Sequence, residues 1–202
     1  MNFTEHYRTQ LIEALSKIDL KTVDQAIELF KQARERDKHI FVCGNGGSAS
    51  TASHFACDIV KGASYERPRR FRILALTDSL PTLTAYSNDV SYECVFAEQL
   101  KNFAQPGDLV MAISGSGNSP NVLRAVEYAN SVGCITLALT GRNGGKLGPL
   151  ASVNIQVDAP HMGRIEDAHM IVCHMIGYSF IESEGCSSGP GSRLKVGSER
   201  SC

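Results

Sequence analysis

The sequence predicts an α/β fold, a three-layer α-β-α sandwich built on a five-stranded parallel sheet of the doubly wound, flavodoxin-like type, with additional helices at the N-terminus. Three observations lead to this prediction. Five short runs of residues are almost continuously apolar, as in strands that are buried on both faces. Segments with helical periodicity separate these runs, which is typical of a parallel sheet covered by helices. Glycine-rich turns follow two of the runs, at the carboxyl ends of strands, where such folds bind their ligands.

The composition favours a cytoplasmic protein that acts on small molecules rather than on nucleic acids or membranes. A chain of 202 residues with 43% hydrophobic and 20% charged residues suits one α/β domain. A net charge of −1 argues against a broad nucleic-acid or membrane surface, and no apolar run is long enough to span a bilayer. The N-terminus shows no signal-peptide core. Seven cysteines without a CxxC pair favour buried thiols over disulfides or a finger-type zinc site.

The expected elements follow the apolar runs and the helical periodicity. Strands are expected at residues 39–43, 71–77, 109–113, 134–140 and 153–157. Helices are expected between and after them at residues 48–62, 95–103, 121–131 and 164–182. The arginine-rich segment 66–70 is interpreted as a solvated turn, because such side chains are mostly exposed.

The two ends of the chain lie outside this alternation. Residues 3–36 are predicted to form one or two amphipathic helices. They precede the first strand, so they pack either on the edge of their own domain or on another subunit, and the sequence leaves both open. Residues 184–202 are rich in glycine and serine and are expected to form a flexible tail. We therefore expect one domain over 1–183, with a helical extension at about 1–36.

The first glycine-rich turn, Gly44-Asn45-Gly46-Gly47, joins an apolar run to a helix that begins near Ser48. Glycine lets the backbone come close to a ligand, and the free N–H groups of a first helical turn attract an anion. The Ser48 hydroxyl is placed where a phosphate oxygen would bind. We therefore expect this turn to form one side of a phosphate site.

The second turn, Ser114-Gly115-Ser116-Gly117-Asn118-Ser119-Pro120, follows the third apolar run and opens another helix. It lacks the Gly-Lys-Ser/Thr ending of a Walker loop and does not match GxGxxG. Glycine turns can simply end strands. Two such turns with serine hydroxyls at the same sheet edge favour phosphate binding, with Ser114, Ser116 and Ser119 as the expected contacts.

Histidine and carboxylate side chains follow the first loop and recur in the last helix. His54 and Asp58 are four residues apart and share a helix face, as a surface pair or as an acid–base or metal pair. Their place behind the loop favours a site. His174 has apolar neighbours, so a core histidine and a functional one are both open at this point. His169, five residues earlier, points about 140° away on a regular helix.

The two loops together, GNGGSA and SGSGNSPN, resemble those of the sugar isomerase (SIS) domain family. Within it the chain is similar to the phosphoheptose isomerase branch over about residues 1 to 183. The segments HF-x-x-D, SND-x-x-Y-x-x-VF and RIE-x-x-H-x-x-x-x-H carry this further resemblance. It implies the flavodoxin-like SIS fold, a sugar-phosphate substrate and a homotetramer with sites at subunit interfaces.

The resemblance also implies roles for particular residues. The phosphate contacts would be Ser48, Ser114, Ser116 and Ser119, while Asn45, Asn88 and Asp89 would line the sugar site. The metal and catalytic set would be His54, Asp58, Glu166 and His174, with Glu166 also near the substrate. Four positions depart from the family pattern: Asp58 replaces Glu, Glu166 replaces Gln, Gly62 replaces Arg and Gly163 replaces Asp.

The implied metal set contains two imidazoles and two carboxylates, which zinc or another divalent ion accepts. His54 and Asp58 can share an ion because they are one turn apart. Glu166 and His174 are separated by about 12 Å of helix rise. Both can reach one ion only with extended side chains or if Glu166 precedes the regular helix.

The function predicted from these residues is a ketose–aldose isomerase acting on a sugar phosphate. The substrate implied by the resemblance is sedoheptulose 7-phosphate, converted to D-glycero-D-manno-heptose 7-phosphate in heptose biosynthesis. Asp58 is expected to act as base and His174 as acid. Two alternatives are a non-catalytic SIS protein that binds a partner such as the bacterial replication initiator, and a sugar-phosphate sensor. The retained carboxylate favours the enzyme over the non-catalytic protein, because binding-only relatives lack it.

Overall fold

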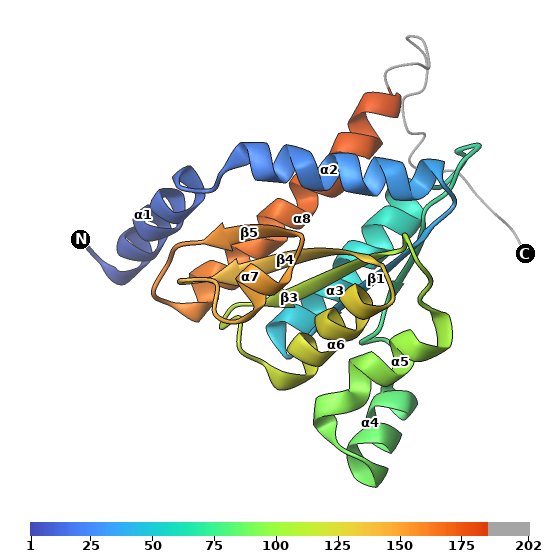
Figure 1. The fold of residues 1–202 in the computed structure, drawn as a ribbon. Helices are drawn as coiled ribbons and strands as arrows, with labels where there is room; N and C mark the ends of the chain where they lie inside the picture. The colour runs from blue at the N-terminus through green and yellow to red at the C-terminus, as the bar shows by residue number, and fades with distance from the viewer. Residues whose placement is uncertain (186–202) are drawn as a thin grey trace, which may run out of the picture.

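The fold is built on five strands in one sheet, in the order β2-β1-β3-β4-β5, as the computed structural model shows (Figure 1). The structure describes residues 1–185, the last three through their backbone alone. The strands are β1 (His39–Gly44), β2 (Arg72–Ala75), β3 (Leu109–Ser114), β4 (Ile135–Gly141) and β5 (Val153–Val157). All neighbouring strands pair in parallel, so the predicted sheet is confirmed.

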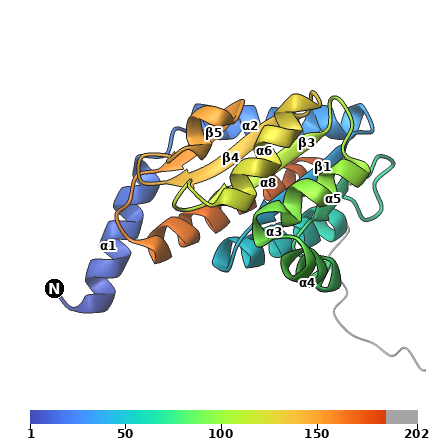
Figure 2. The same ribbon diagram turned by 60° about the horizontal axis from the view of Figure 1, so that its bottom comes forward.

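Helices cover both faces of the sheet (Figures 1 and 2). The α-helices are α1 (Phe3–Ser16), α2 (Leu20–Glu35), α3 (Gly47–Cys57), α4 (Leu80–Asp89), α5 (Val95–Phe103), α6 (Pro120–Ser131), α7 (Leu147–Leu150) and α8 (Met162–Gly185). Strand side chains alternate between two apolar cores: Ile40 and Val42 pack with α2, α3 and α8, whereas Phe41 and Cys43 pack with α5 and α6. The predicted three-layer sandwich is therefore confirmed.

The strand order places the two glycine-rich loops side by side. The chain passes from β1 outward to β2 and then returns to β3 on the other side of β1. Gly44, the last residue of β1, pairs with Ile113, the residue before the end of β3. The loops after β1 and β3 therefore meet where the strand order reverses, the usual ligand position in a doubly wound sheet.

The N-terminal segment forms two helices that pack on the chain's own domain. Helix α2 lies across β1 and β5 and contacts α8, and α1 packs along α8. The Tyr7 hydroxyl of α1 donates a hydrogen bond of 2.6 Å to Asp167 in α8. Both N-terminal helices thus help to hold the last helix, which carries the predicted site residues Glu166 and His174.

The predicted helix at residues 48–62 is not α-helical throughout. Helix α3 ends at Cys57, and a π-helical turn follows at Asp58–Gly62. The Ala63 N–H donates to the Asp58 carbonyl at 3.2 Å, five residues back. The buried Ser64 hydroxyl donates to the Ile59 carbonyl at 2.8 Å and ends the turn. This side-chain bond competes with the α-helical pattern, and periodicity alone did not reveal it.

Two other segments differ from the sequence-based expectation. Strand β2 is shorter than residues 71–77, because Phe71 N–H bonds the Ser64 hydroxyl at its start and the Asp78 N–H turns back to the Ala75 carbonyl at its end. Residues 80–89, to which no element was assigned, form α4, which has no buried residue.

The arginine-rich turn before β2 contacts the end of α2. Arg69 donates to the Glu35 carbonyl at 2.6 Å, and Arg72 pairs with the Asp37 carboxylate at 3.0 Å. These arginines thus bond to acceptors at and just past the C-terminus of α2 while they are exposed. Within residues 1–185, no helix is long and apolar enough to cross a membrane. The tail predicted at 184–202 lies outside the described residues, apart from 184 and 185, which end α8.

Candidate active site

The two serine-bearing loops line a common cavity of about 230 Å³. Ser48 lies in the first turn of α3 and is buried, as is Ser114 at the end of β3. The Ser114 hydroxyl oxygen is 3.5 Å from that of Ser116 and 3.4 Å from that of Ser119. Four hydroxyls therefore converge beside a helix N-terminus, as a phosphate group requires.

Glycine is required where these loops turn. Gly46 has a φ of +54°, a left-handed conformation that begins α3. Gly117 has a φ of +63°, and a Cβ there would lie 2.2 Å from the Gly144 carbonyl oxygen. The second loop thus packs directly against the turn after β4. This contact fixes the position of the cavity's outer wall.

Asn45 lies in the cavity wall, but its side chain is engaged by other protein groups. Its amide exchanges two hydrogen bonds with the amide of Asn121, at 2.8 and 2.9 Å. The Tyr92 hydroxyl also donates to Asn45 Oδ1, at 2.8 Å. Neither Asn121 nor Tyr92 was assigned a role from the sequence. The SPN and SND-x-x-Y segments that contain them were the available signals.

Glu166 belongs to the loop cavity. Its carboxylate lies against the backbone of the first loop, since a Cβ on Gly47 would be 2.7 Å from the carboxylate atoms. Met162, one turn earlier in α8, lines the same cavity. The first turns of α8 therefore close the loop pocket, and they place one negative charge in it.

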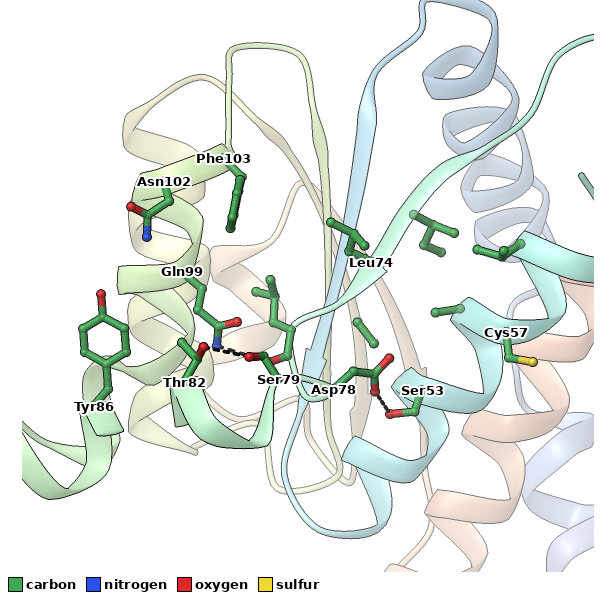
Figure 3. Close-up of a pocket in the computed structure, with 15 residues that line it drawn as sticks. Ser53, Cys57, Leu74, Asp78, Ser79, Thr82, Tyr86, Gln99, Asn102 and Phe103 are labelled. Atoms are coloured by element: carbon green, nitrogen blue, oxygen red, sulfur yellow. Dashed lines mark hydrogen bonds between the residues drawn. The ribbon is translucent and has the colours of Figure 1, made fainter. Parts of the chain in front are cut away.

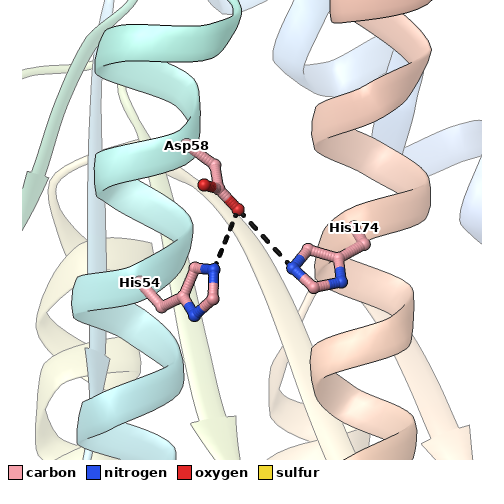
Figure 4. Close-up of side chains that lie close together, drawn as sticks. All are labelled: His54, Asp58 and His174. Atoms are coloured by element: carbon pink, nitrogen blue, oxygen red, sulfur yellow. Dashed lines mark ion pairs between the residues drawn. The ribbon is translucent and has the colours of Figure 1, made fainter.

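A second group of polar side chains lies between α3 and α8 (Figure 4). Asp58 Oδ2 is 3.3 Å from His54 Nε2 and 3.6 Å from His174 Nε2. The side chains of His54 and His174 are 51% and 41% exposed, and that of Asp58 is 25% exposed. We call these three residues the histidine–carboxylate cluster. The packing of α3 against α8 places both histidines beside the same carboxylate.

The donor set of this cluster suits a divalent metal ion. One ligand atom from each of the three residues lies within 4.8 Å of the others. Two imidazoles and one carboxylate are ligands that zinc accepts, and three protein ligands leave a fourth position open, as in catalytic sites. Glu166 is not among these residues. The structure therefore does not bring the fourth sequence-predicted ligand to the cluster.

The sequence of this chain is similar to those of known proteins. The SIS domain model matches residues 5–141, about two thirds of the chain. The chain belongs to the SIS domain family. A relative from Thermoplasma volcanium named "Probable phosphoheptose isomerase" is 40% identical over 179 residues, which are 85% of this chain and 91% of the relative. The phosphoheptose isomerase of Alteromonas mediterranea is 38% identical over 176 residues, or 86% and 87% of the two chains.

A solved structure supports the same assignment. The phosphoheptose isomerase of Neisseria gonorrhoeae superposes with a TM-score of 0.81 at 33% identity, covering 88% of this chain and 96% of that one. The recognition of the SIS family and of its phosphoheptose isomerase branch from the loops and histidine segments is therefore confirmed.

At Gly62 and Gly163, where the family pattern has larger residues, neighbouring side chains occupy the space that a larger side chain would need. A Cβ on Gly62 would lie 2.7 Å from Ile181 Cδ1, so α8 packs directly on the π-helical turn. A Cβ on Gly163 would lie 3.1 Å from the Tyr7 hydroxyl. Larger residues at either position therefore require these neighbours to move.

His169 is a core residue, as its direction on the helix suggested. It is completely buried, and Nε2 lies 3.0 Å from the Thr140 carbonyl oxygen. Its Nδ1 has no hydrogen-bond partner among the described residues. Burial lowers the pKa of His169 to about 4, so the ring is neutral at pH 7 and anchors α8 to the end of β4.

Asn88 and Asp89, predicted to line the sugar site, lie at the exposed end of α4. Asn88 donates to the Asp89 carboxylate at 2.7 Å. The loop cavity of this chain does not include them. Their assignment to the sugar site stays a prediction.

A hollow larger than the loop cavity lies on the other side of α3 (Figure 3). It measures about 590 Å³ and is bordered by α3, β2, α4 and α5. Ser53 and Cys57 of α3 face it, whereas the next residue in each case, His54 and Asp58, belongs to the cluster. Leu74 of β2 is 52% exposed there. α3 thus separates the hollow from the histidine–carboxylate cluster.

Proposed function

We propose that this SIS protein is a phosphoheptose isomerase, which converts sedoheptulose 7-phosphate to D-glycero-D-manno-heptose 7-phosphate in heptose biosynthesis. The observation that carries the proposal is the meeting of His54, Asp58 and His174 between α8 and the helical segment that begins at the first glycine loop. Relatives at 38–40% identity over most of the chain are phosphoheptose isomerases by name. Ketose–aldose isomerisation requires an acid–base set beside the reacting carbons, and a phosphate cavity close to that set can hold the other end of the substrate.

The spacing along α3 suits a seven-carbon substrate. Six residues, about 9 Å of helix rise, separate Ser48 from His54. An extended sugar phosphate of seven carbons covers such a span, with its phosphate at the serine hydroxyls and its carbonyl end near the cluster. Holding the non-reacting end removes much of the entropy cost of orienting the reacting carbons.

Asp58 is the proposed base. It takes the proton from the carbon next to the carbonyl, and the resulting enediol receives a proton at the neighbouring carbon. Asp58 Oδ2 faces both histidines, which leaves Oδ1 for the substrate proton. His174 is the proposed acid, because its protonated ring can donate a proton to the carbonyl oxygen of the ketose and then accept one from the hydroxyl on the neighbouring carbon as the aldehyde forms.

We also propose that His54, Asp58 and His174 hold zinc or a similar divalent ion. Bound there, the ion would supply Lewis-acid stabilisation of the carbonyl oxygen as negative charge develops on it. The support for it is the ligand set and its open fourth position. Glu166 stays a predicted ligand only if its side chain leaves the loop cavity.

A homotetramer is the proposed assembly. The support from this chain is apolar surface that its own elements leave exposed, including Val60, Leu74 and Phe103 around the hollow beside α3. The partly exposed cluster is consistent with a site that a second subunit covers. Light scattering at micromolar protein should give the mass of four chains, and a monomer would refute the assembly.

The direct test is incubation of the purified protein with sedoheptulose 7-phosphate, with and without added zinc. We expect heptose 7-phosphate to form, and an Asp58→Asn variant to lose most of the rate. Binding of the substrate without any conversion under either condition would refute the isomerase and favour a sensor of the sugar phosphate. Failure to bind at all would favour the non-catalytic partner protein.

A further inference from the structure

The two phosphate loops are joined by a pair of asparagine amides. Asn45 Nδ2 donates to Asn121 Oδ1 at 2.8 Å, and Asn121 Nδ2 donates to Asn45 Oδ1 at 2.9 Å. Asn45 is the residue before Gly46 in the first loop. Asn121 follows Ser119 by two residues and lies in the first turn of α6. The pair therefore spans the two loops at the residues that flank their phosphate-facing parts.

The oxygens of this pair have no capacity left for a ligand. Asn45 Oδ1 also accepts from the Tyr92 hydroxyl at 2.8 Å, so both of its lone pairs are used. Asn121 Oδ1 also accepts from the Val122 N–H at 3.0 Å. Asn121 is 2% exposed. A buried amide whose oxygen has both acceptor positions filled holds its position strongly, because breaking one bond leaves a buried polar group without a partner.

We propose that Asn121 is a positioning residue, which sets the distance between the two serine loops through Asn45 and thereby determines phosphate affinity. Tyr92 is the third member, and its hydroxyl holds the orientation of the Asn45 amide. The proposal rests on the proposed function in one respect only, that the loop cavity binds the phosphate of the substrate. Asn45 then contributes to phosphate binding through loop geometry, and its carbonyl oxygen takes no part in contacting the sugar.

This arrangement predicts a particular kinetic pattern. The phosphate is bound equally in the ground state and in the transition state, so a wider loop spacing raises KM and leaves kcat nearly unchanged. Loss of a residue that merely stabilises the fold would lower the melting temperature without raising KM selectively over kcat. The pair also acts as a unit, so removing both amides should cost no more affinity than removing one.

The test compares two asparagines of the same helix. Asn121→Ala removes the link between the loops. Asn130→Ala is the matched control, because Asn130 lies at the other end of α6 and also makes two side-chain hydrogen bonds, to the Leu150 carbonyl and the Thr136 hydroxyl. Titration calorimetry with inorganic phosphate, thermal melting and the KM and kcat for sedoheptulose 7-phosphate are measured for each. We expect Asn121→Ala to raise the phosphate Kd and the KM about tenfold, and Asn130→Ala to change only the melting temperature.

Two further variants keep the result decisive. Tyr92→Phe removes one hydroxyl from an exposed side chain and should fold normally, with a rise of a few fold in phosphate Kd. The double variant Asn45→Ala/Asn121→Ala should match Asn121→Ala. Unchanged phosphate Kd in Tyr92→Phe and Asn121→Ala, while the wild type binds phosphate, would overturn the positioning role. A wild type that binds no phosphate would instead refute the phosphate cavity itself.

Discussion

The loop cavity and the histidine–carboxylate cluster both lie between α8 and the segment that begins at Gly46, but they are held in different ways. In the loops the hydroxyls are bonded to the backbone: Ser114 Oγ accepts from the Gly117 N–H and Ser116 Oγ from the Asn118 N–H, both at 3.2 Å. The cluster side chains contact one another between two helices, and both histidines are more than two-fifths exposed.

The difference indicates which half of the site is formed before the substrate arrives. Loop hydroxyls held by backbone hydrogen bonds are preorganised, so binding a phosphate there costs little conformational entropy. The cluster histidines are about half exposed and lack such backbone hydrogen bonds in the part of the chain that the structure describes, so we expect their geometry to depend on what they bind. The loop cavity should therefore keep its geometry whether or not a metal ion binds, whereas the cluster should not.

The largest effect is expected at the cluster. His54→Ala and His174→Ala should each remove the bound metal and lower kcat at least a hundredfold, because each removes one of the three proposed ligands, and His174→Ala also removes the proposed acid. Metal analysis by mass spectrometry and the isomerase rate measure both. His6→Ala, an exposed histidine of α1, is the control and should change neither.

The same variants distinguish the two halves of the site. Phosphate affinity should be preserved in both, since the loops do not depend on the cluster. Wild-type protein purified without chelator that contains almost no metal and is fully active would rule out the ion and leave His174 as a simple acid.

His169 gives the second effect, on stability at low pH. Its folded pKa of about 4 is below the unfolded value near 6.5, so the unfolded chain binds the proton first as the pH falls. The stabilisation is complete above pH 6.5 and is lost progressively between pH 6.5 and 4, on the order of 3 kcal/mol in total. Urea unfolding across this range should show a flatter pH dependence in His169→Gln than in the wild type. An equal slope would contradict the neutral buried ring.

The serine hydroxyls give the third effect. Ser48→Ala and Ser116→Ala should each raise KM about tenfold or more with a smaller change in kcat, because a charge-assisted hydrogen bond to phosphate contributes about 1.5–3 kcal/mol. Ser131→Ala, whose hydroxyl bonds the Tyr128 carbonyl at the end of α6, is the matched control. If both loop variants bind the sugar phosphate as tightly as wild type, the loop cavity is not the phosphate site.

The smallest effect decides where Glu166 acts. Glu166→Gln removes a negative charge from the loop cavity and should strengthen phosphate binding a few fold at low ionic strength, with metal content unchanged. A fall in metal content would show that Glu166 leaves the cavity to bind the ion. Titration with phosphate and metal analysis of the same samples separate the two outcomes.

Most of the fold could be predicted because both faces of the sheet are buried. Runs such as Phe41 to Cys43 and Val110 to Ile113 have no exposed position, so their strands stand out from any amphipathic helix. Helix α4 could not be predicted from its apolar pattern, since it buries no residue. The π-helical turn depends on the Ser64 hydroxyl bonding a distant carbonyl, which leaves no periodic signal.

The site was predicted in part for a related reason. The glycine loops and the His54–Asp58 pair are local in sequence, so their spacing places them correctly. Glu166 was expected to join His174 because of the family resemblance, although about 12 Å of helix rise separates them. In the structure its carboxylate lies against Gly47 in the loop cavity. The pairing of Asn45 with Asn121 depends on the strand order, which brings together loops that are distant in the chain.

Because a π-helical turn follows Cys57, the number of residues in this turn determines which side chains lie beside the cluster. Such a turn holds one residue more than an α-helical turn, and Val60 within it is exposed. Loss of one codon there would restore a regular helix and leave His54 and Asp58 on the same face, while a different residue would come to lie opposite Ile181, where Gly62 lies now. Inserting or deleting one codon can thus change which residue lies opposite Ile181, near Asp58, without altering any residue of the cluster.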